Sequence, residues 1–411
     1  MNSTDPTVAG STAPYRDASL AVPDVAAPRV GGLPSGALDA ITDVGGVTVG
    51  HCTLAQGAVQ TGVTVLRVHG RSHYLFKVPA AATVFNGFGK SVGLMQVDEL
   101  GTLETPIALT NTFSVPAVAQ AQIRQAIAEH PEIGRAWPTL NPLVFECNDG
   151  YLNDIQAMAV QASHYAQAVD VATARFAQGA VGAGRGMSCF GLKGGIGSAS
   201  RLVTVGSSHS SLHGSPHSSP HSAPHATSGA QDLNAGPHYT VGALVLSNFG
   251  RLRDLIVLGQ PLGVRLAAAD RQAPELDKGS IIMLLATDAP LDARQLRRLS
   301  ARAGAGLART GSYLGHGSGD IALAFSTAYT IPQQVSEPMP ALAMLHEQLL
   351  DGLFQAAADA TEQAILSSLW HAESVSGRDG HARSSLRTMA TMRASARPGV
   401  NPYSQTPDRI D

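Results

Sequence analysis

The sequence is poor in charge, in aromatic residues and in cysteine. The low charge and the cysteine spacing each argue against a class of protein. Charged residues make up 14% of the 411 residues, and a formal net charge of -3 provides no basic surface for nucleic acid or for an anionic membrane. Aromatic residues account for only 5%. The three cysteines, Cys52, Cys147 and Cys189, show no CxxC spacing, which argues against a disulfide framework and against a zinc ribbon.

Long apolar runs are also missing. No run reaches the roughly 18 residues that a membrane-spanning helix needs. The first 35 residues contain Pro and Asp where a signal peptide would have a basic flank and an apolar core. We therefore expect a soluble, cytoplasmic protein with no nucleic-acid or membrane partner. What the chain does have is 44% apolar residues and 43 glycines, which predict a globular core with close packing and many turns.

We predict a single domain at 34–388, with a tail at each end of it and one insertion within it. Residues 1–33 and 389–411 contain proline and lack hydrophobic periodicity, which is typical of tails. Residues 207–239 hold a repeat of histidines spaced four apart, at His209, His213, His217, His221 and His225. Prolines between them exclude a helix, so we interpret the segment as a low-complexity surface loop. Its imidazoles could chelate a metal weakly, but a flexible loop fixes no ligand geometry, and we predict no metal site.

The hydrophobic patterns alternate between strands and helices. Apolar, β-branched stretches predict strands at Ala40–Leu54, Val63–Val68, Thr105–Thr110, Pro142–Glu146, Val241–Asn248, Leu255–Leu258, Ser280–Ala286 and Asp320–Thr327. Helical patterns lie at about 115–129, 153–177, 293–309 and 340–371. Asp292 is placed to cap the third helix. The Ala-rich segment 156–176 is nearly uncharged, which favours a helix buried between other elements. Together these predict a layered α/β fold in which helices cover a mostly antiparallel pair of sheets.

Several conspicuous patterns have ordinary explanations. The glycine clusters at 179–186 and 194–197 match neither GxGxxG after a strand nor GxxxxGK[ST], so we predict tight turns and no nucleotide cofactor. Four arginines on the helix at 293–309 lie mostly away from its apolar stripe, which favours a solvated face over a nucleic-acid patch. The pair His51-Cys52 is isolated, and we expect it in the core.

The Gly279-Ser280 step, directly before the apolar strand Ile281–Ala286, suits one particular chemistry. A glycine before a scissile bond leaves its carbonyl open to attack by the hydroxyl of Ser280. Cleavage would give Ser280 an α-amine with an unperturbed pKa of about 7.7–8.0. Such a group is a competent general base for its own hydroxyl. A simple strand boundary remains the alternative for this pair.

Polar residues also stand at the ends of other predicted strands. Ser318 and Asp320 precede an apolar strand and share one side of it by the two-residue period, so they could orient a nucleophile. Asn248 ends another strand, and its amide could donate to an oxyanion, an interaction worth about 3–4 kcal/mol. Glu146, Asp149 and Tyr151 crowd one turn, which is either a substrate pocket or an Asx-rich turn.

These segments together resemble the L-aminopeptidase/D-esterase-amidase family, which includes the β-peptidyl aminopeptidases. The resemblance covers about residues 34–388 apart from the His-rich insertion. It is carried by DAITDVGGVTVGH (39–51), VDELGTLETPIALTNTFSV (97–115), ECNDGYLND (146–154), GLKGGIGSASR (191–201), TVGALVLSNFG (240–250), GSIIMLLATDAPL (279–291) and GLARTGSYLGHGSGDIALAFST (306–327).

The resemblance implies a four-layer αββα sandwich, similar to the N-terminal-nucleophile hydrolases but differently connected. It implies self-cleavage at Gly279–Ser280 into an α chain ending at 279 and a β chain starting at 280. Ser280 falls on the family's nucleophile and Asn248 on its oxyanion donor. Ser318 and Asp320 fall on the Ser/acid pair beside the nucleophile, and Tyr151 on a catalytic pocket position.

The same resemblance implies that Asp149, with the nearby Glu146, holds the substrate amine, that no metal or cofactor is needed, and that processed protomers form a homotetramer. We therefore expect an autoprocessing N-terminal serine hydrolase that removes N-terminal residues from short peptides, amides or esters. Two alternatives remain at this stage. One is an acyl or aminoacyl transferase on the same fold, and the other is a metal-sequestering scaffold that uses the His-rich loop.

Overall fold

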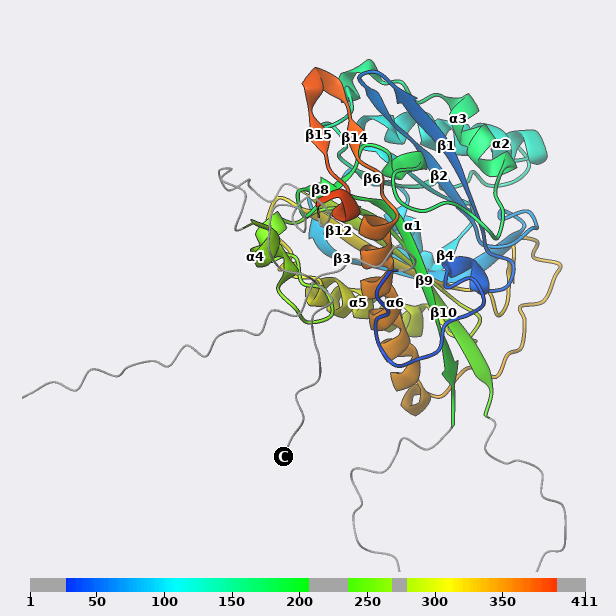
Figure 1. Cartoon of the computed structure of the whole chain (residues 1–411). Helices are drawn as coiled ribbons and strands as arrows, with labels where there is room; N and C mark the ends of the chain where they lie inside the picture. Colours follow the sequence, from blue (N-terminus) through cyan, green and yellow to red (C-terminus); the bar gives the residue numbers. More distant parts are fainter. Residues whose placement is uncertain (1–26, 207–235, 268–278, 390–411) are drawn as a thin grey trace, which may run out of the picture.

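The computed structural model describes residues 27–206, 236–267 and 279–389 (Figure 1). Two stacked β-sheets form the centre of the molecule, and each is covered on its outer face by a pair of helices. This is the predicted four-layer αββα sandwich, so the expected fold class is confirmed. Of the His-rich insertion predicted at 207–239, residues 207–235 lie outside the described residues, and the strand that follows already begins at His238.

The smaller sheet has the strand order β1-β2-β5-β6. Its strands are β1 (Thr48–Gln56), β2 (Val59–Arg67), β5 (Ile107–Asn111) and β6 (Leu143–Cys147). The pairs β1·β2 and β2·β5 are antiparallel, whereas β5 and β6 are parallel. Because β5 and β6 are parallel, their carboxyl ends at Asn111 and Cys147 lie side by side.

The larger sheet has the order β13-β3-β12-β11-β10-β9, with β4 pairing to β3. Its strands are β3 (Phe76–Gly87), β4 (Thr102–Leu103), β9 (Gly195–Thr204), β10 (His238–Asn248), β11 (Ser280–Thr287), β12 (Gly319–Ser326) and β13 (Ile331–Pro332). Only β11 and β12 are parallel. As predicted, the sheets are mostly antiparallel.

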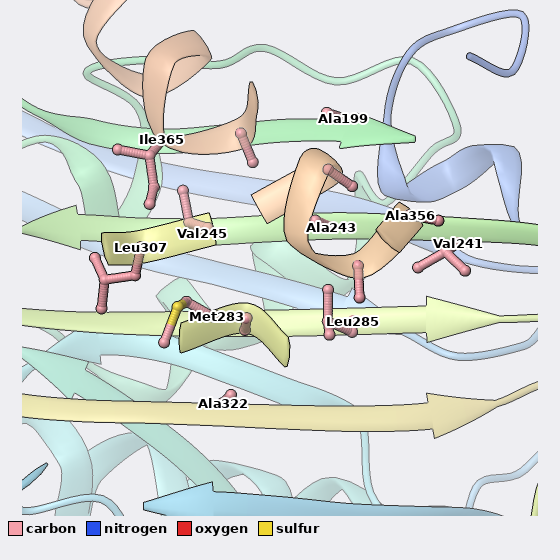
Figure 2. Packing of buried hydrophobic residues seen from close by; sticks show 14 of the residues in the cluster. Ala199, Val241, Ala243, Val245, Met283, Leu285, Leu307, Ala322, Ala356 and Ile365 are labelled. Carbon is pink, nitrogen blue, oxygen red and sulfur yellow. The ribbon is translucent and has the colours of Figure 1, made fainter. Parts of the chain in front are cut away.

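Three buried clusters fill the three spaces between the layers. One lies between the two sheets and includes Leu109, Phe145, Leu246 and Ile282. A second packs the outer face of the smaller sheet against α2 (Val115–Glu129) and α3 (Ala162–Asp170). The third and largest packs the outer face of the larger sheet against α5 (Ala293–Arg309) and α6 (Asp351–Trp370). Figure 2 shows this last contact, where strand residues such as Val245 and Met283 lie against Leu307 of α5 and Ile365 of α6.

Short elements complete the described chain. They are α1 (Leu94–Leu100), α4 (Leu262–Ala267), the pair β7 (Ser188–Cys189) and β8 (Leu192–Lys193), and the hairpin β14 (Val375–Ser376) and β15 (Ala382–Arg383). No helix in the three described ranges is long and apolar enough to cross a bilayer.

Helix α5 agrees with its prediction in every detail. It spans the predicted residues, and the side chain of Asp292 accepts a hydrogen bond from the Gln295 amide at its start. Its arginines face outward and bind carboxylates of the same chain: Arg294 and Arg298 pair with Glu347, and Arg297 pairs with Asp98. The solvated-face interpretation is therefore correct.

The prediction for 153–177 was wrong. Only Ala162–Asp170 is α-helical, and after it Thr173 pairs with Val49 at the edge of β1. Helix α3 buries one face, through Tyr165, Ala168 and Val169, and exposes the other. Alanine lowers the charge of a segment without supplying enough apolar surface to bury it on all sides, so low charge alone overstated the burial.

Other boundaries also differ. The predicted strand at Leu255–Leu258 is a turn, and β3 and β9 were not predicted at all. Helix α6 begins at Asp351 rather than 340. Val30, which precedes the predicted domain start at 34, is buried and donates its amide to Gln363 of α6.

Candidate active site

The predicted reactive residues gather at one end of the larger sheet, where three adjacent strands begin or end. We call this end of the sheet the site edge. Ser280, the first residue of β11, lies opposite Asn248, the last residue of β10, in the antiparallel ladder. On its other side Ser280 lies beside Gly319, the first residue of β12, in the parallel ladder. Ser280 is therefore flanked by an asparagine side chain and by the start of the Ser318–Asp320 strand.

The surroundings of Ser280 are closely packed. The Gly319 amide donates a hydrogen bond of 3.2 Å to Ser280 Oγ, and Ser280 itself is only 8% exposed. A Cβ atom added to Gly279 would lie 2.3 Å from the Cα of Phe249 and 2.4 Å from the carbonyl oxygen of Asn248. Glycine is thus required at 279 because no side chain fits there.

The β12 side of Ser280 carries a hydroxyl bonded to a carboxylate. Ser318 donates to the Asp320 carboxylate, and both residues are buried. The other oxygen of this carboxylate accepts a 2.9 Å hydrogen bond from Asn86 Nδ2. The ladder between β3 and β12 has an irregularity between Asp320 and Ile321. Such a bulge re-aims a side chain, and here it accompanies the contact of Asp320 with both partners.

The β10 side carries an amide whose orientation is set by two hydrogen bonds. Asn248 Oδ1 accepts from the Ser188 backbone amide at 2.8 Å, and Asn248 Nδ2 donates to the Asn148 carbonyl at 2.9 Å. Because Oδ1 is held by a donor, the amide group cannot flip without losing both bonds. The second Nδ2 hydrogen has no partner within the described ranges. It is available to a negative charge that develops beside Ser280.

Glu146 approaches the site edge from the smaller sheet, where it lies near the end of β6. Its carboxylate accepts from the Lys90 amide at 2.7 Å and from the Thr112 hydroxyl. Gly89 separates it from Ser280: a Cβ on Gly89 would lie 3.4 Å from Glu146 Oε1 and 3.9 Å from the Cα of Gly319. The two sheets therefore meet at Gly89, with Glu146 on one side and the β11–β12 strand starts on the other.

Asp149 is more enclosed than Glu146. It is 0% exposed, Asn153 donates to its Oδ1 at 3.0 Å, and its Oδ2 has no partner within hydrogen-bond geometry. Burial raises the pKa of Asp149 to about 6, against the opposing effect of the nearby Thr61, Asn153 and Asn111 side chains. The turn that holds Asp149 also supplies the Asn148 carbonyl that binds Asn248.

Negative charge is concentrated around Cys147. This thiol is fully buried between the sheets, and burial together with the charges of Glu146, Asp320 and Asp149 raises its pKa well above the ordinary value. All three carboxylates thus lie close enough to this thiol to act on its pKa.

Tyr151 packs against the C-terminal hairpin. Its ring stacks on His381, with centroids 4.6 Å apart, and the guanidinium of Arg383 sits 3.7 Å from the ring centroid. Within the described ranges no hydrogen bond joins its hydroxyl to Ser280. Arg383 also donates to the hydroxyl of Ser188, whose backbone amide holds Asn248. Tyr151 therefore contacts the site through the C-terminal hairpin.

The other sequence signals lie outside the site edge. His51 is half-buried and bonds Thr64 and the Ala177 carbonyl, and burial lowers its pKa to about 4. Of this pair only Cys52 belongs to the core, in the cluster beneath α2 and α3. In the described part of the chain no three His, Cys, Asp or Glu side chains form a group able to hold a metal ion. The His repeat at 209–225 lies outside those residues.

Sequence reasoning missed several contributors to the site. Asn86, Gly89 and the Gly319 amide were not singled out, because β3 was not predicted and a backbone donor leaves no mark on residue type. Lys193, which directly precedes the glycine cluster at 194–197, was given no role, yet it is fully buried beneath the turn that holds Asn248. Its signal was available: a lysine inside a run of glycine and apolar residues.

Comparisons with known proteins identify relatives of this chain. The model of peptidase family S58 matches residues 39–213 and 226–383. The chain is 35% identical over 386 residues to the β-peptidyl aminopeptidase BapA of Sphingosinicella xenopeptidilytica, covering 88% of each sequence.

Solved structures show the same similarity over the whole fold. A β-aminopeptidase from a Burkholderia species superposes with a TM-score of 0.75 at 35% identity, covering 91% of this chain and 98% of that one. The L-aminopeptidase D-Ala-esterase/amidase of Ochrobactrum anthropi, described as a variant of the Ntn-hydrolase fold, gives a TM-score of 0.74 at 31% identity. The match covers 90% of this chain and 98% of that structure.

Proposed function

The chain belongs to peptidase family S58 and is an aminopeptidase, and from this premise we propose that it is an autoprocessing enzyme whose nucleophile is Ser280. One observation carries the proposal. Ser280 lies at a strand mouth, paired with Asn248 of β10 and with Gly319 of β12, and the neighbours of Gly319, Ser318 and Asp320, form a buried hydroxyl–carboxylate pair. This is the arrangement that nucleophilic catalysis needs: a nucleophile, an anion-stabilising donor and a group that manages protons.

Processing would begin with attack of Ser280 Oγ on the carbonyl carbon of Gly279. The hydroxyl proton leaves as the C–O bond forms, and the Gly279–Ser280 C–N bond then breaks with protonation of the Ser280 nitrogen. Water hydrolyses the resulting ester and frees a chain that starts at Ser280. The close packing of Gly279 against Phe249 supports this step, because it restricts the position of the peptide that would be cleaved.

Turnover would use the same groups with the new α-amine as general base. Ser280 Oγ attacks the scissile carbonyl, and the Asn248 amide with the Gly319 backbone N–H stabilises the oxyanion. The Ser280 amine, polarised by Ser318 and Asp320, takes the hydroxyl proton and gives it to the leaving group. Water then hydrolyses the aminoacyl ester and returns Ser280.

We propose that the substrate's free amine is held by the buried carboxylates, with Glu146 as the main partner and Asp149 behind it. Glu146 is favoured because only Gly89 separates it from the site edge. Replacing Glu146 with Gln should raise KM for substrates with a free amine. N-acetylated analogues, which lack that amine, should be as poor substrates for the variant as for the wild type. An unchanged KM would assign amine binding to another group.

The substrate class follows from the chemistry of the site together with the relatives' names. We propose short peptides, amides or esters with a free N-terminal amine, including β-amino acyl groups. We also propose a homotetramer of processed protomers, which light scattering after size-exclusion chromatography would test.

Intact mass and N-terminal sequencing of the purified protein test the proposal. We expect two fragments that sum to the full chain, the smaller beginning Ser-Ile-Ile-Met. Replacing Ser280 with Ala should leave one uncut chain without aminopeptidase activity. An uncut S280A protein with full activity would refute the assignment of the nucleophile.

A further inference from the structure

Lys193 is a fully buried lysine whose ammonium group is enclosed by backbone carbonyls. Its Nζ donates to Gly184 O at 2.8 Å, to Met187 O at 2.8 Å and to Gly194 O at 2.7 Å. Its exposed fraction is 0%. Burying such a group is costly unless its hydrogen bonds are satisfied, and three carbonyl oxygens satisfy all three donors of an ammonium.

The three contacts also indicate the charge state. A neutral amine has two N–H donors and one lone pair, so it could satisfy only two of these acceptors. Burial and the positive charge of Arg185 lower the pKa of Lys193 well below its usual value, while Cys189 and Asp149 act in the opposite direction. The coordination by three acceptors favours the ammonium form.

One of the three acceptors belongs to the peptide unit that holds Asn248. The Met187 carbonyl and the Ser188 N–H are the two ends of a single peptide group. Lys193 binds the carbonyl end, and the N–H end donates to Asn248 Oδ1 at 2.8 Å. A continuous chain of hydrogen bonds therefore runs from the ammonium through one peptide group to the amide of Asn248.

We propose that Lys193 is a positioning residue for the reaction, which orients and polarises the Asn248 amide through the Met187–Ser188 peptide. A cation on the carbonyl makes the N–H of the same peptide a stronger donor, and a stronger bond to Asn248 Oδ1 makes its N–H₂ group a stronger donor in turn. The buried charge of Lys193 thus stabilises the oxyanion at Ser280 without touching the substrate. This inference rests on the proposed role of Asn248.

A purely structural role makes a different prediction, because the turn has other supports. The Gly194 amide also donates to the Met187 carbonyl, at 3.1 Å, and the Phe190 amide bonds the Phe249 carbonyl. These bonds remain when the ammonium is removed, so a loss of charge alone should leave the turn in place and slow only the chemical step. A residue that only held the turn would instead affect stability and substrate binding along with the chemical step.

The test combines substitutions at Lys193 and Asn248 in the processed enzyme. Lys193→Met removes the charge, and Lys193→Gln removes it while keeping two N–H donors. We expect kcat to fall about 10–100-fold in both variants, as for outer partners of other sites, with KM within about twofold. Self-cleavage in freshly made protein should slow by a similar factor, because it forms an oxyanion at the same place.

The double variant K193M/N248A decides how Lys193 acts. If Lys193 works through Asn248, the double variant should be no slower than N248A alone. Multiplied defects would overturn the proposal, as would an unchanged kcat in K193M or failure of both Lys193 variants to fold. A wild-type kcat in N248A would instead refute the proposed oxyanion role, so the two failures are distinguishable.

Arg185→Met is the matched control. Arg185 lies in the same turn and is a cation close enough to affect the pKa of Lys193, but its side chain bonds Gln60 rather than the Met187–Ser188 peptide. We expect its kcat to stay near the wild-type value. A loss equal to that of K193M would mean that any positive charge in the turn has this effect. It would overturn the proposed path through the Met187–Ser188 peptide.

Discussion

The two sides of Ser280 are built alike but end in opposite charges. On the β10 side, a hydrogen-bond chain runs from Asn248 through the Ser188 amide to the buried ammonium of Lys193. On the β12 side, the chain runs from Ser318 to the carboxylate of Asp320, which Asn86 also binds. A cation at the far end strengthens donors directed at a developing anion, whereas a carboxylate strengthens acceptance of a proton. We therefore propose that the β10 side stabilises the developing charge and that the β12 side manages the proton.

Replacing Asp320 with Asn should give the largest loss of the three changes below. The variant keeps the shape of the side chain but removes the charge that polarises Ser318. We expect self-cleavage and turnover each to slow about 10²–10⁴-fold, the range for loss of proton transfer. Mass spectrometry over time measures the first rate, and hydrolysis of an aminoacyl anilide measures the second.

Asp98→Asn is a suitable control for that experiment, because this carboxylate is exposed and pairs with Arg297 on the protein surface. It should retain the wild-type rates. If D320N processed itself and turned over substrate normally, the β12 side would have no part in proton transfer.

Replacing Asn248 with Ala tests the β10 side. Loss of one oxyanion donor should lower kcat about 10²–10³-fold with little change in KM. Ser188→Ala is the matched control, because it retains the backbone N–H that binds Asn248. A variant N248A with an unchanged kcat would leave charge stabilisation to the Gly319 amide alone.

The smallest effect is expected from Asp149→Asn, and it concerns stability against pH. Burial raises the pKa of Asp149 to about 6 in the folded protein, above the value of about 3.9 for an unfolded chain. The folded state therefore binds this proton more tightly, and the resulting stabilisation is complete below about pH 4 and is lost as the pH rises through 6. Above pH 7 the buried charge costs roughly 3 kcal/mol.

The asparagine variant cannot titrate at this position. We expect it to melt at a higher temperature than the wild type at pH 8 and at nearly the same temperature at pH 4.5. Scanning calorimetry of the intact assembly at the two pH values measures the difference. Parallel melting temperatures across this range would show that Asp149 keeps an ordinary pKa in the folded protein.

The success of the predictions follows the strength of the local pattern. Helix α5 was predicted to the residue, because an N-cap, an apolar stripe and a charged face all agree. Strand β3 was missed, although it supplies Asn86 to the site, since its residues Phe76–Gly87 mix charged, proline and alanine positions. Its strand conformation is imposed by its neighbours β12 and β4 in the sheet.

The helix predicted at 153–177 failed for a related reason. Its alanines favour a helix locally, yet Thr173 completes a backbone bridge to Val49 instead. A tertiary contact here outweighs a weak propensity, which for single residues amounts to less than about 1 kcal/mol.

By itself the sequence determined the layered fold and the segments that carry the reactive groups. A Ser, Asn or Asp at the end of a strand, next to a long apolar run, is a local feature that can be recognised from the sequence. Only the tertiary structure decided how the groups face one another: that Asn248 and Ser280 are partners across one ladder, that Glu146 reaches the site past Gly89, and that Lys193 lies under Asn248. These relations join residues that are far apart in the chain. They are set by strand register and by the packing of the layers, which no local pattern encodes.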